Sequence, residues 1–283
     1  MRTLAYFPNN RAFNSGAVMR AFEKSASKHF KLVKNSLDCD MAVIWSCLWA
    51  GRMRGNKEIY DHYRAQNKIV IIIEVGAIER GTTWKIALNH ITSEGIYGNT
   101  KNLNPDRIRK LGLVPVHQHT GDNGKILLAG QHLASHQLYK LDNYENWLLQ
   151  QIEEIKKYTD RRIVIRPHPR SQINQNNFPL HTARFQIPVH LADTYDNFDI
   201  NFSFHCLVNY NSFGPPFGSI MHGCPIIVDK TSLCHPVSNT YKDIEQLKEK
   251  DQTEWLLQIA HTEYTVEEIR NGDWYKRLEE YLG

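Results

Sequence analysis

The sequence predicts an α/β protein with two doubly wound domains, each a parallel sheet covered by helices on both faces. Short continuous apolar runs alternate with amphipathic segments, as in strands buried on both faces and separated by helices. The pattern stops at a polar turn, residues 120–124, and then restarts. A chain of 283 residues is long enough for two domains. The expected domains are residues 1–120 and 121–270, followed by a C-terminal helix over 271–283.

In the first half, strands are predicted at apolar runs and helices where apolar residues recur every three or four positions. Val18 and Phe22 show this helical spacing. The predicted elements are a strand at Thr3–Phe7, a helix at Ser15–Lys28, a strand at Met41–Trp45, a helix at Asn56–Gln66 and a strand at Ile69–Ile73.

In the second half the same alternation returns. Leu148, Ile152 and Ile155 form one stripe of the longest predicted helix. The predicted elements are a strand at Lys125–Ala129, a helix at Tyr144–Tyr158, strands at Arg162–Ile165 and Leu207–Tyr210, a short helix at Pro215–His222, a strand at Pro225–Val228 and a helical tail from Thr253.

The composition is that of an ordinary globular protein. Hydrophobic residues make up 41% and charged residues 23%, which argues against disorder. No stretch approaches the ~20 apolar residues that a membrane span needs, and the N-terminus lacks the apolar core of a signal peptide. We therefore expect a cytoplasmic protein without a membrane partner. The 5 cysteines show no metal-binding spacing and are expected to be free thiols.

Charge is distributed unevenly along the chain. Residues 1–120 contain 18 Lys and Arg against 9 Asp and Glu, a net charge of +9. Residues 121–283 contain 16 against 21, a net charge of −5. Because clustered basic side chains attract phosphates, the first half is expected to bind a polyanion. The alternative is a solvated surface that happens to be basic.

The segment Arg166–Arg170 has the sequence Arg-Pro-His-Pro-Arg and follows a predicted buried strand. Ligands bind at the carboxyl ends of strands in open α/β sheets. The two prolines restrict the loop, and arginine offers a planar fork that matches phosphate oxygens. This loop is therefore predicted to hold a diphosphate. The alternative is a surface loop with exposed arginines.

Two further segments follow strands of the same predicted sheet. Residues 209–219 open a short helix, whose backbone N–H groups and positive dipole end would bind an anion. Residues 223–233 end in polar side chains, of which Thr231 and Ser232 would bind a nucleotide or sugar, or simply cap the loop.

These three segments, in this order, resemble GT-B glycosyltransferases. That group includes transferases acting on capsular polysaccharide and bacteriophage enzymes that add glucose or arabinose to hydroxymethylcytosine in DNA. The resemblance spans roughly residues 130–233 and the final helices at 268–282, whereas the first 120 residues carry no matching motif. It implies two Rossmann-like domains facing a central cleft, with the nucleotide diphosphate on the second. Phe213 and the pair Pro215-Pro216 depart from the family pattern. The candidate donor-binding residues are Gln131, Arg166, His168, Arg170, Asn211, Ser212, Phe213, Gly214 and Ser232.

In the family, the acceptor side lies on the first domain. A transferase that inverts the anomeric carbon needs a base, usually Asp or Glu. Glu74 follows five apolar strand residues and is the preferred candidate, with Glu79 second and Asp40 and His90 as alternatives. The Asp-x-Asp sequence that ends at Asp40 precedes its strand, which is the wrong edge of a parallel sheet. We therefore expect neither a metal nor another cofactor.

The preferred function is transfer of a sugar from a uridine-diphosphate sugar to the hydroxymethyl group of modified cytosine in double-stranded phage DNA. The alternatives are transfer to a cell-surface polysaccharide and a sugar-nucleotide-binding module without catalysis. The basic residues expected to bind DNA are Arg52, Arg54, Lys57, Arg80, Arg107, Arg109 and Lys110.

Overall fold

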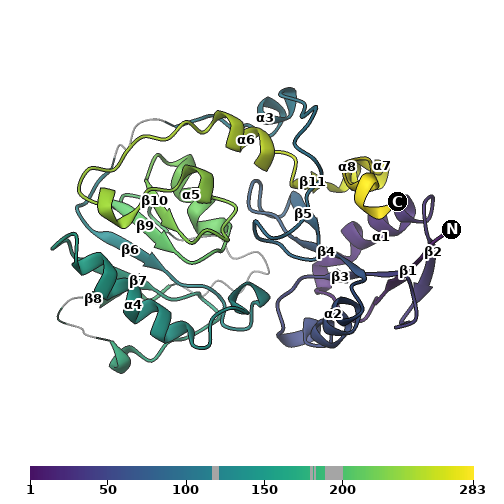
Figure 1. The fold of residues 1–283 in the computed structure, drawn as a ribbon, viewed down its shortest axis with the longest axis horizontal. Helices are drawn as coiled ribbons and strands as arrows, with labels where there is room; N and C mark the ends of the chain where they lie inside the picture. The colour runs from purple at the N-terminus through teal and green to yellow at the C-terminus, as the bar shows by residue number, and fades with distance from the viewer. Residues whose placement is uncertain (117–120, 179–180, 182, 189–199) are drawn as a thin grey trace. The chain divides into compact units, whose positions relative to one another are not determined.

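The computed structural model describes residues 1–116, 121–178, 181, 183–188 and 200–283. The chain forms two compact units, each with its own sheet and core (Figure 1). Unit 1 comprises Met1–Leu111 and Leu257–Gly283, and unit 2 comprises Gly112–Leu256. The protein is therefore a mixed α/β protein, as the sequence predicts. The expected boundary after residue 120 borders residues 117–120, which lie outside the described residues.

Unit 1 contains a six-stranded sheet in the order β11-β5-β4-β3-β1-β2. Strands β1 to β4 are parallel to one another, but β5 is antiparallel to β4, and β11 is antiparallel to β5. The sheet is therefore mixed rather than parallel throughout. Its strands are β1 (Thr3–Tyr6), β2 (Lys31–Lys34), β3 (Met41–Trp45), β4 (Ile69–Val75), β5 (Thr83–Leu88) and β11 (Glu263–Thr265).

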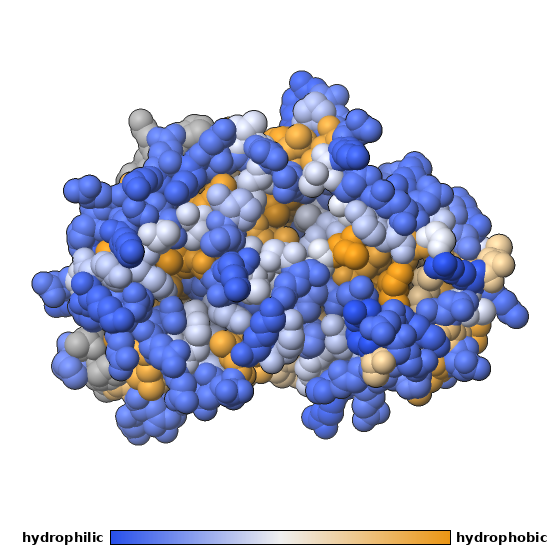
Figure 2. Space-filling view, viewed as in Figure 1, coloured by the Kyte–Doolittle hydropathy of each residue, from blue (hydrophilic) through white to orange (hydrophobic). Residues whose placement is uncertain are grey.

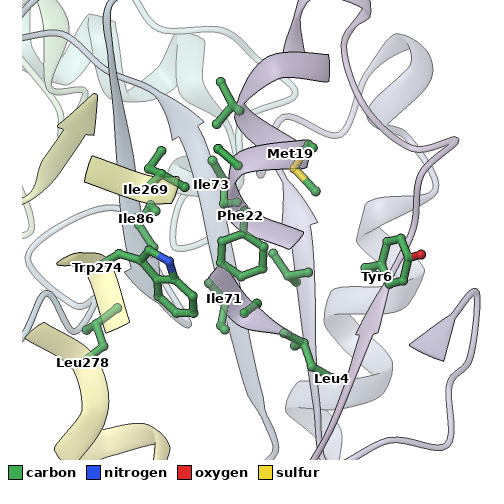
Figure 3. Close-up of a cluster of buried hydrophobic side chains, with 14 of the residues drawn as sticks. Leu4, Tyr6, Met19, Phe22, Ile71, Ile73, Ile86, Ile269, Trp274 and Leu278 are labelled. Carbon is green, nitrogen blue, oxygen red and sulfur yellow. The ribbon is translucent and has the colours of Figure 1, made fainter. Parts of the chain in front are cut away.

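Helices cover both faces of this sheet. One face carries Ile71 and Ile73 of β4 and packs against α1 (Gly16–Ala26), α7 (Val266–Asn271) and α8 (Asp273–Leu282) (Figure 3). The other face carries Val70 and Ile72 and packs against α2 (Asn56–Ala65). The alternation along β4 follows from the two-residue period of a strand. A short helix, α3 (Asp106–Lys110), completes the first segment of the unit.

The C-terminal segment returns to unit 1. Strand β11 pairs with β5, and Thr265 begins α7 with a capping box in which its side chain and that of Glu268 each accept a backbone N–H. Residues 257–270 thus differ from their expected place in a domain over 121–270. The expected separate helix over 271–283 is α8, and it packs within the core of unit 1.

Unit 2 contains a five-stranded sheet in the order β10-β9-β6-β7-β8, and all its pairs are parallel. Helix α4 (Tyr144–Lys156) packs its apolar stripe on one face, whereas α5 (Gly214–Met221) connects β9 to β10. Helix α6 (Thr253–Ile259) leads back to unit 1. The strands are β6 (Ile126–Ala129), β7 (Ile163–Arg166), β8 (Ala183–Phe185), β9 (Cys206–Asn209) and β10 (Ile226–Val228).

The visible surface is mostly hydrophilic, and the cysteines lie in the interior. Hydrophilic side chains cover most of the face seen in Figure 2, with smaller apolar areas between them. All the cysteines are buried free thiols. Within the described ranges, the helices are too short or too polar to cross a membrane.

Candidate functional site

Each sheet has one point at which its strand order reverses. In unit 1 the chain passes from β1 to β2 on one side and then to β3 on the other. In unit 2 it runs from β6 through β7 to β8, and β9 then lies on the other side of β6. Ligands of open α/β sheets bind beyond the carboxyl ends of the strands at such points. The candidate sites are therefore the loops after β1 and β3, and those after β6 and β9.

In unit 2, the side chain of Gln131 joins these two loops. Its Oε1 accepts the backbone N–H groups of Asn211 at 2.8 Å and Ser212 at 3.1 Å. Its Nε2 donates to Oδ1 of Asn211 at 3.1 Å. Both carboxamides are buried and committed to protein partners, so Gln131 and Asn211 fix the shape of the site.

Asn211 and Ser232 also connect to neighbouring loops. Nδ2 of Asn211 donates to the Gln137 carbonyl and to Oγ1 of Thr231, both at 3.0 Å. Ser232 is fully buried, and its Oγ accepts the backbone N–H of Cys234 at 3.1 Å. Ser232 thus caps its own loop, which is the alternative role given to it above. The polar groups of both side chains thus make hydrogen bonds inside the protein, and their direct contact with the donor stays a prediction.

The start of α5 offers few free backbone N–H groups among the described residues. The backbone N–H of Ser212 donates to Oδ1 of Asn209 at 2.9 Å as well as to Gln131, and Pro215 and Pro216 have no N–H. Phe213 is buried against Phe217, with ring centroids 5.1 Å apart. Ser212 and Gly214 are half-buried.

The Arg166–Arg170 loop lies beside this switch point. Arg166 is the last residue of β7 and is buried, which lowers the pKa of its guanidinium because desolvation penalises the cation. The backbone N–H of Gly130 donates to the Arg166 carbonyl at 2.7 Å. A Cβ at Gly130 would lie 3.0 Å from Cα of Pro167, so this close approach of the two loops favours glycine.

Two histidines meet on the same loops. The ring centroids of His132 and His168 are 5.1 Å apart, and Nδ1 of His168 accepts the backbone N–H of Arg170 at 3.1 Å. Both rings are half-buried, and Arg170 is exposed. Arg166, His168 and Arg170 thus lie on one loop at the carboxyl end of β7, and their role in donor binding stays a prediction. His132, which directly follows Gln131, was not among the candidate residues.

In unit 1, Ser46 and Glu74 lie at the carboxyl ends of adjacent strands. Glu74 belongs to β4 and is half-buried. Its Oε2 accepts the hydroxyl of Ser46 at 2.7 Å, and its Oε1 accepts the backbone N–H of Val75 at 2.9 Å. The preferred carboxylate is therefore held at a strand end where ligands can bind. Ser46 was not among the candidate residues.

The other candidate bases lie elsewhere. Asp40 directly precedes β3 and so lies at the amino edge of the sheet. Its carboxylate accepts the backbone N–H (2.7 Å) and the hydroxyl (2.8 Å) of Thr3. These two hydrogen bonds hold the pKa of Asp40 below its usual value. His90 follows β5, and because β5 is antiparallel, it too lies at the amino edge. Asp40 and His90 therefore lie at the opposite edge of the sheet from Glu74. Glu79 is exposed in the turn between β4 and β5.

The loops after β1 and β3 form a basic surface with one exposed aromatic ring. Residues 7–15 and 46–57 contain four basic residues and no Asp or Glu. The Arg52 guanidinium lies 4.0 Å from the ring centroid of Phe13, and Arg52 Nε donates to the Arg11 carbonyl at 3.2 Å. Phe13 is 85% exposed. We name Arg11, Phe13, Arg52 and Arg54 the basic loop surface. Phe13 and Arg11 were missed because a single Arg or Phe in a loop gives no sequence signal.

Arg107 and Lys110 do not belong to an open basic cluster. Arg107 makes two hydrogen bonds to the Glu268 carboxylate, at 2.5 and 2.9 Å, and Lys110 lies 2.8 Å from the same carboxylate. Arg107 also donates to the carbonyls of Ala260 and Glu263. The Arg107 guanidinium is therefore committed to the C-terminal segment, and its contact with DNA stays a prediction.

The remaining basic candidates are at the surface or in a turn. Lys57 pairs with Asp61, and Arg109 pairs with Asp106, on exposed helix faces. Arg80 is half-buried beside Thr83.

The return of the C-terminal segment to unit 1 changes the net charge of each unit. Unit 1 contains 21 Lys and Arg against 15 Asp and Glu, a net charge of +6, and unit 2 contains 13 against 15, a net charge of −2.

Comparison with known proteins identifies the fold. No family model matches the sequence, and no curated protein sequence matches it. Among solved structures, the chain is similar to KpsC of Thermosulfurimonas dismutans, a beta Kdo 2,4 transferase, with a TM-score of 0.53 and 11% sequence identity. The match covers 95% of this chain and 97% of that chain. At this identity the likeness establishes a shared fold.

In the part of the chain that the structure describes, no three His, Cys, Asp or Glu side chains are grouped closely enough to hold a metal ion.

Proposed function

We propose that the protein is a glycosyltransferase that takes its sugar from a nucleotide-sugar donor. The observation that supports this most directly is the Arg166–Arg170 loop at the carboxyl end of β7, beside the switch point of unit 2. A likeness to a sugar transferase over 95% of the chain adds to it. In this proposal the two units are the two halves of a GT-B enzyme, and unit 2 binds the donor.

The donor site that we propose differs from the full set of sequence candidates. Arg166, His168 and Arg170 would contact the diphosphate, with His132 beside them. Gln131, Asn211 and Ser232 would hold the loops in place through the hydrogen bonds described above. Because a buried charge interacts strongly in a low dielectric, Arg166 would contribute most of the electrostatic affinity. The expectation that no metal is needed stays part of this proposal.

We expect Arg166→Ala to weaken binding of uridine diphosphate by about 1.5–3 kcal/mol, because a charge-assisted hydrogen bond to phosphate is lost. Isothermal titration calorimetry measures this change. Arg162→Ala is the matched control, since Arg162 is exposed just before the same strand begins. An unchanged affinity in a folded Arg166→Ala protein would remove this residue from the donor site.

The acceptor side would lie on unit 1. We propose Glu74 as the base that accepts the proton of the acceptor hydroxyl, with Glu79 as the second candidate. Glu74 is favoured because it is held at the carboxyl end of β4 by two hydrogen bonds. The basic loop surface follows β1 and β3 at the same edge of the sheet.

For the acceptor, we propose double-stranded DNA that carries hydroxymethylcytosine. The support is the basic loop surface, which combines arginines for phosphates with an exposed ring for an unstacked base. Arg107 is not part of this surface, because its guanidinium binds the Glu268 carboxylate. A second candidate is an acidic polysaccharide, favoured by the likeness to a Kdo transferase.

If the basic loop surface holds DNA, duplex binding should fall steeply with salt, with a log–log slope of roughly −0.9 for each phosphate neutralised. Charge reversal at Arg52 and Arg54 together should flatten the slope by roughly 2 and leave uridine-diphosphate affinity unchanged. Filter binding across a salt series measures this. Arg162→Glu is the control, because Arg162 is an exposed arginine of unit 2. A wild-type protein that binds no duplex at low salt, but glycosylates an acidic saccharide, would establish the second candidate instead.

A further inference from the structure

Ser46 has a backbone conformation that serine rarely adopts. It is buried directly after β3, and its φ of 64° lies in the left-handed region. Of the five non-glycine residues with positive φ in the described chain, the other four are asparagines, which tolerate this region better. Strain of this kind is kept where the surrounding structure enforces it, often at functional sites.

The left-handed turn directs the Ser46 hydroxyl to Glu74. Oγ of Ser46 donates to Oε2 of Glu74 at 2.7 Å and accepts the backbone N–H of Leu48 at 3.0 Å. The backbone N–H of Ser46 donates to the Ile73 carbonyl at 2.7 Å, which fixes the turn against β4. Since the hydroxyl proton is committed to the carboxylate, Ser46 acts on Glu74 as a donor only.

Glu74, Lys85 and Glu263 lie side by side on the neighbouring strands β4, β5 and β11. Lys85 of β5 is the register partner of both Glu74 and Glu263. Glu263 is fully buried and accepts the backbone N–H groups of Ala77 and Ile78 and the hydroxyl of Thr83. Directly opposed residues of neighbouring strands lie on one face, so Glu74 is the half-buried end of a polar row. Its carboxylate has a fixed orientation but still has lone pairs to accept a proton.

We propose that Ser46 is a positioning residue that orients the Glu74 carboxylate for proton abstraction from the acceptor hydroxyl. This inference depends on the proposed function. In that step the acceptor oxygen bonds to the anomeric carbon, the bond from that carbon to the diphosphate breaks, and the diphosphate leaves with the electron pair. The proton of the acceptor hydroxyl passes to Glu74.

The substitution Ser46→Gly distinguishes a role of Ser46 in positioning Glu74 from a role in stabilising the fold. Ser46→Gly removes the hydroxyl and also relieves the left-handed strain, so it should leave Tm unchanged or higher. Its kcat should nevertheless fall about tenfold to a hundredfold, because a misplaced base is inefficient. The dissociation constant of uridine diphosphate should stay the same. Asn67→Gly is the matched control, since Asn67 has a φ of 56° before β4, at the other edge of the sheet.

A double variant tests whether Ser46 acts through Glu74. Glu74→Gln alone should lower kcat about 10²–10⁴-fold. Adding Ser46→Gly to Glu74→Gln should cause no further loss, because the group that Ser46 orients is already gone. If wild-type protein is active and Ser46→Gly keeps full kcat, or if the two losses multiply, the inference is wrong and the proposed function stands. If wild-type protein transfers sugar to neither DNA nor polysaccharide, the proposed function fails and this inference fails with it.

Discussion

Replacing Trp274 with alanine is expected to lower the free energy of unfolding by about 3–5 kcal/mol. Trp274 is fully buried in the core of unit 1 (Figure 3). Its ring stacks on Phe22 of α1 with centroids 4.6 Å apart, and its Nε1 donates to the Ser25 hydroxyl at 2.9 Å. The substitution would leave a large cavity between α1 and α8. It would also remove the indole donor to the buried Ser25 hydroxyl, so both effects lower the free energy of unfolding.

Thermal and urea unfolding of the Trp274→Ala protein measure this effect, and a fall in Tm of roughly 10 °C is expected. Tyr281→Ala is the control on the same helix, because Tyr281 is 37% exposed and its removal creates no cavity. If Trp274→Ala unfolds like the wild type, α8 does not help to close the core of unit 1. The test bears directly on the placement of residues 257–283.

Seven parallel strands were predictable because they are short apolar runs, whereas β2 and β8 were missed. Met41–Trp45 is the clearest example, since all five residues are buried and the predicted bounds agree with β3. Strand β2 begins and ends with exposed lysines, so it shows no continuous apolar run. Strand β5 was missed because its sequence, Thr-Trp-Lys-Ile-Ala-Leu, places Lys85 among buried residues. The carboxylates of Glu74 on β4 and Glu263 on β11 are opposed to Lys85 and compensate its buried charge. Such pairing comes from the tertiary structure and leaves no local pattern.

The candidate sites were predictable to a similar extent. The sequence Arg-Pro-His-Pro-Arg after an apolar run predicts polar residues at the carboxyl end of a strand, and Arg166 is the last residue of β7. The sequence does not show which polar residues are used internally. The sequence predicts Asn211 and Gln131 as donor contacts, whereas in the structure these two residues hydrogen-bond each other. Ser46 gave no signal because a positive φ at serine cannot be read from the sequence.

Arg107 tests the distinction between a binding residue and a structural one. Arg107→Ala is expected to cost about 3–5 kcal/mol of unfolding free energy, because it breaks a largely buried ion pair with Glu268. The guanidinium also serves the carbonyls of Ala260 and Glu263, so the C-terminal segment would lose several contacts at once. Arg109→Ala is the control two residues away, since its pair with Asp106 is exposed and contributes little.

The pH dependence of this ion pair gives a second measurement. Burial alone would raise the pKa of Glu268, but hydrogen bonds from Arg107 and Lys110 lower it from 4.5 to about 2. A carboxylate with a lowered pKa stabilises the folded protein above its unfolded value, and that stabilisation is lost as the pH falls from about 4.5 to about 2. Arg107→Ala should therefore reduce the loss of stability between pH 5 and pH 3, whereas Arg109→Ala should leave it unchanged. If Arg107→Ala instead keeps full stability at every pH but weakens DNA binding, Arg107 contacts the acceptor, and the ion pair with Glu268 does not hold the C-terminal segment in place.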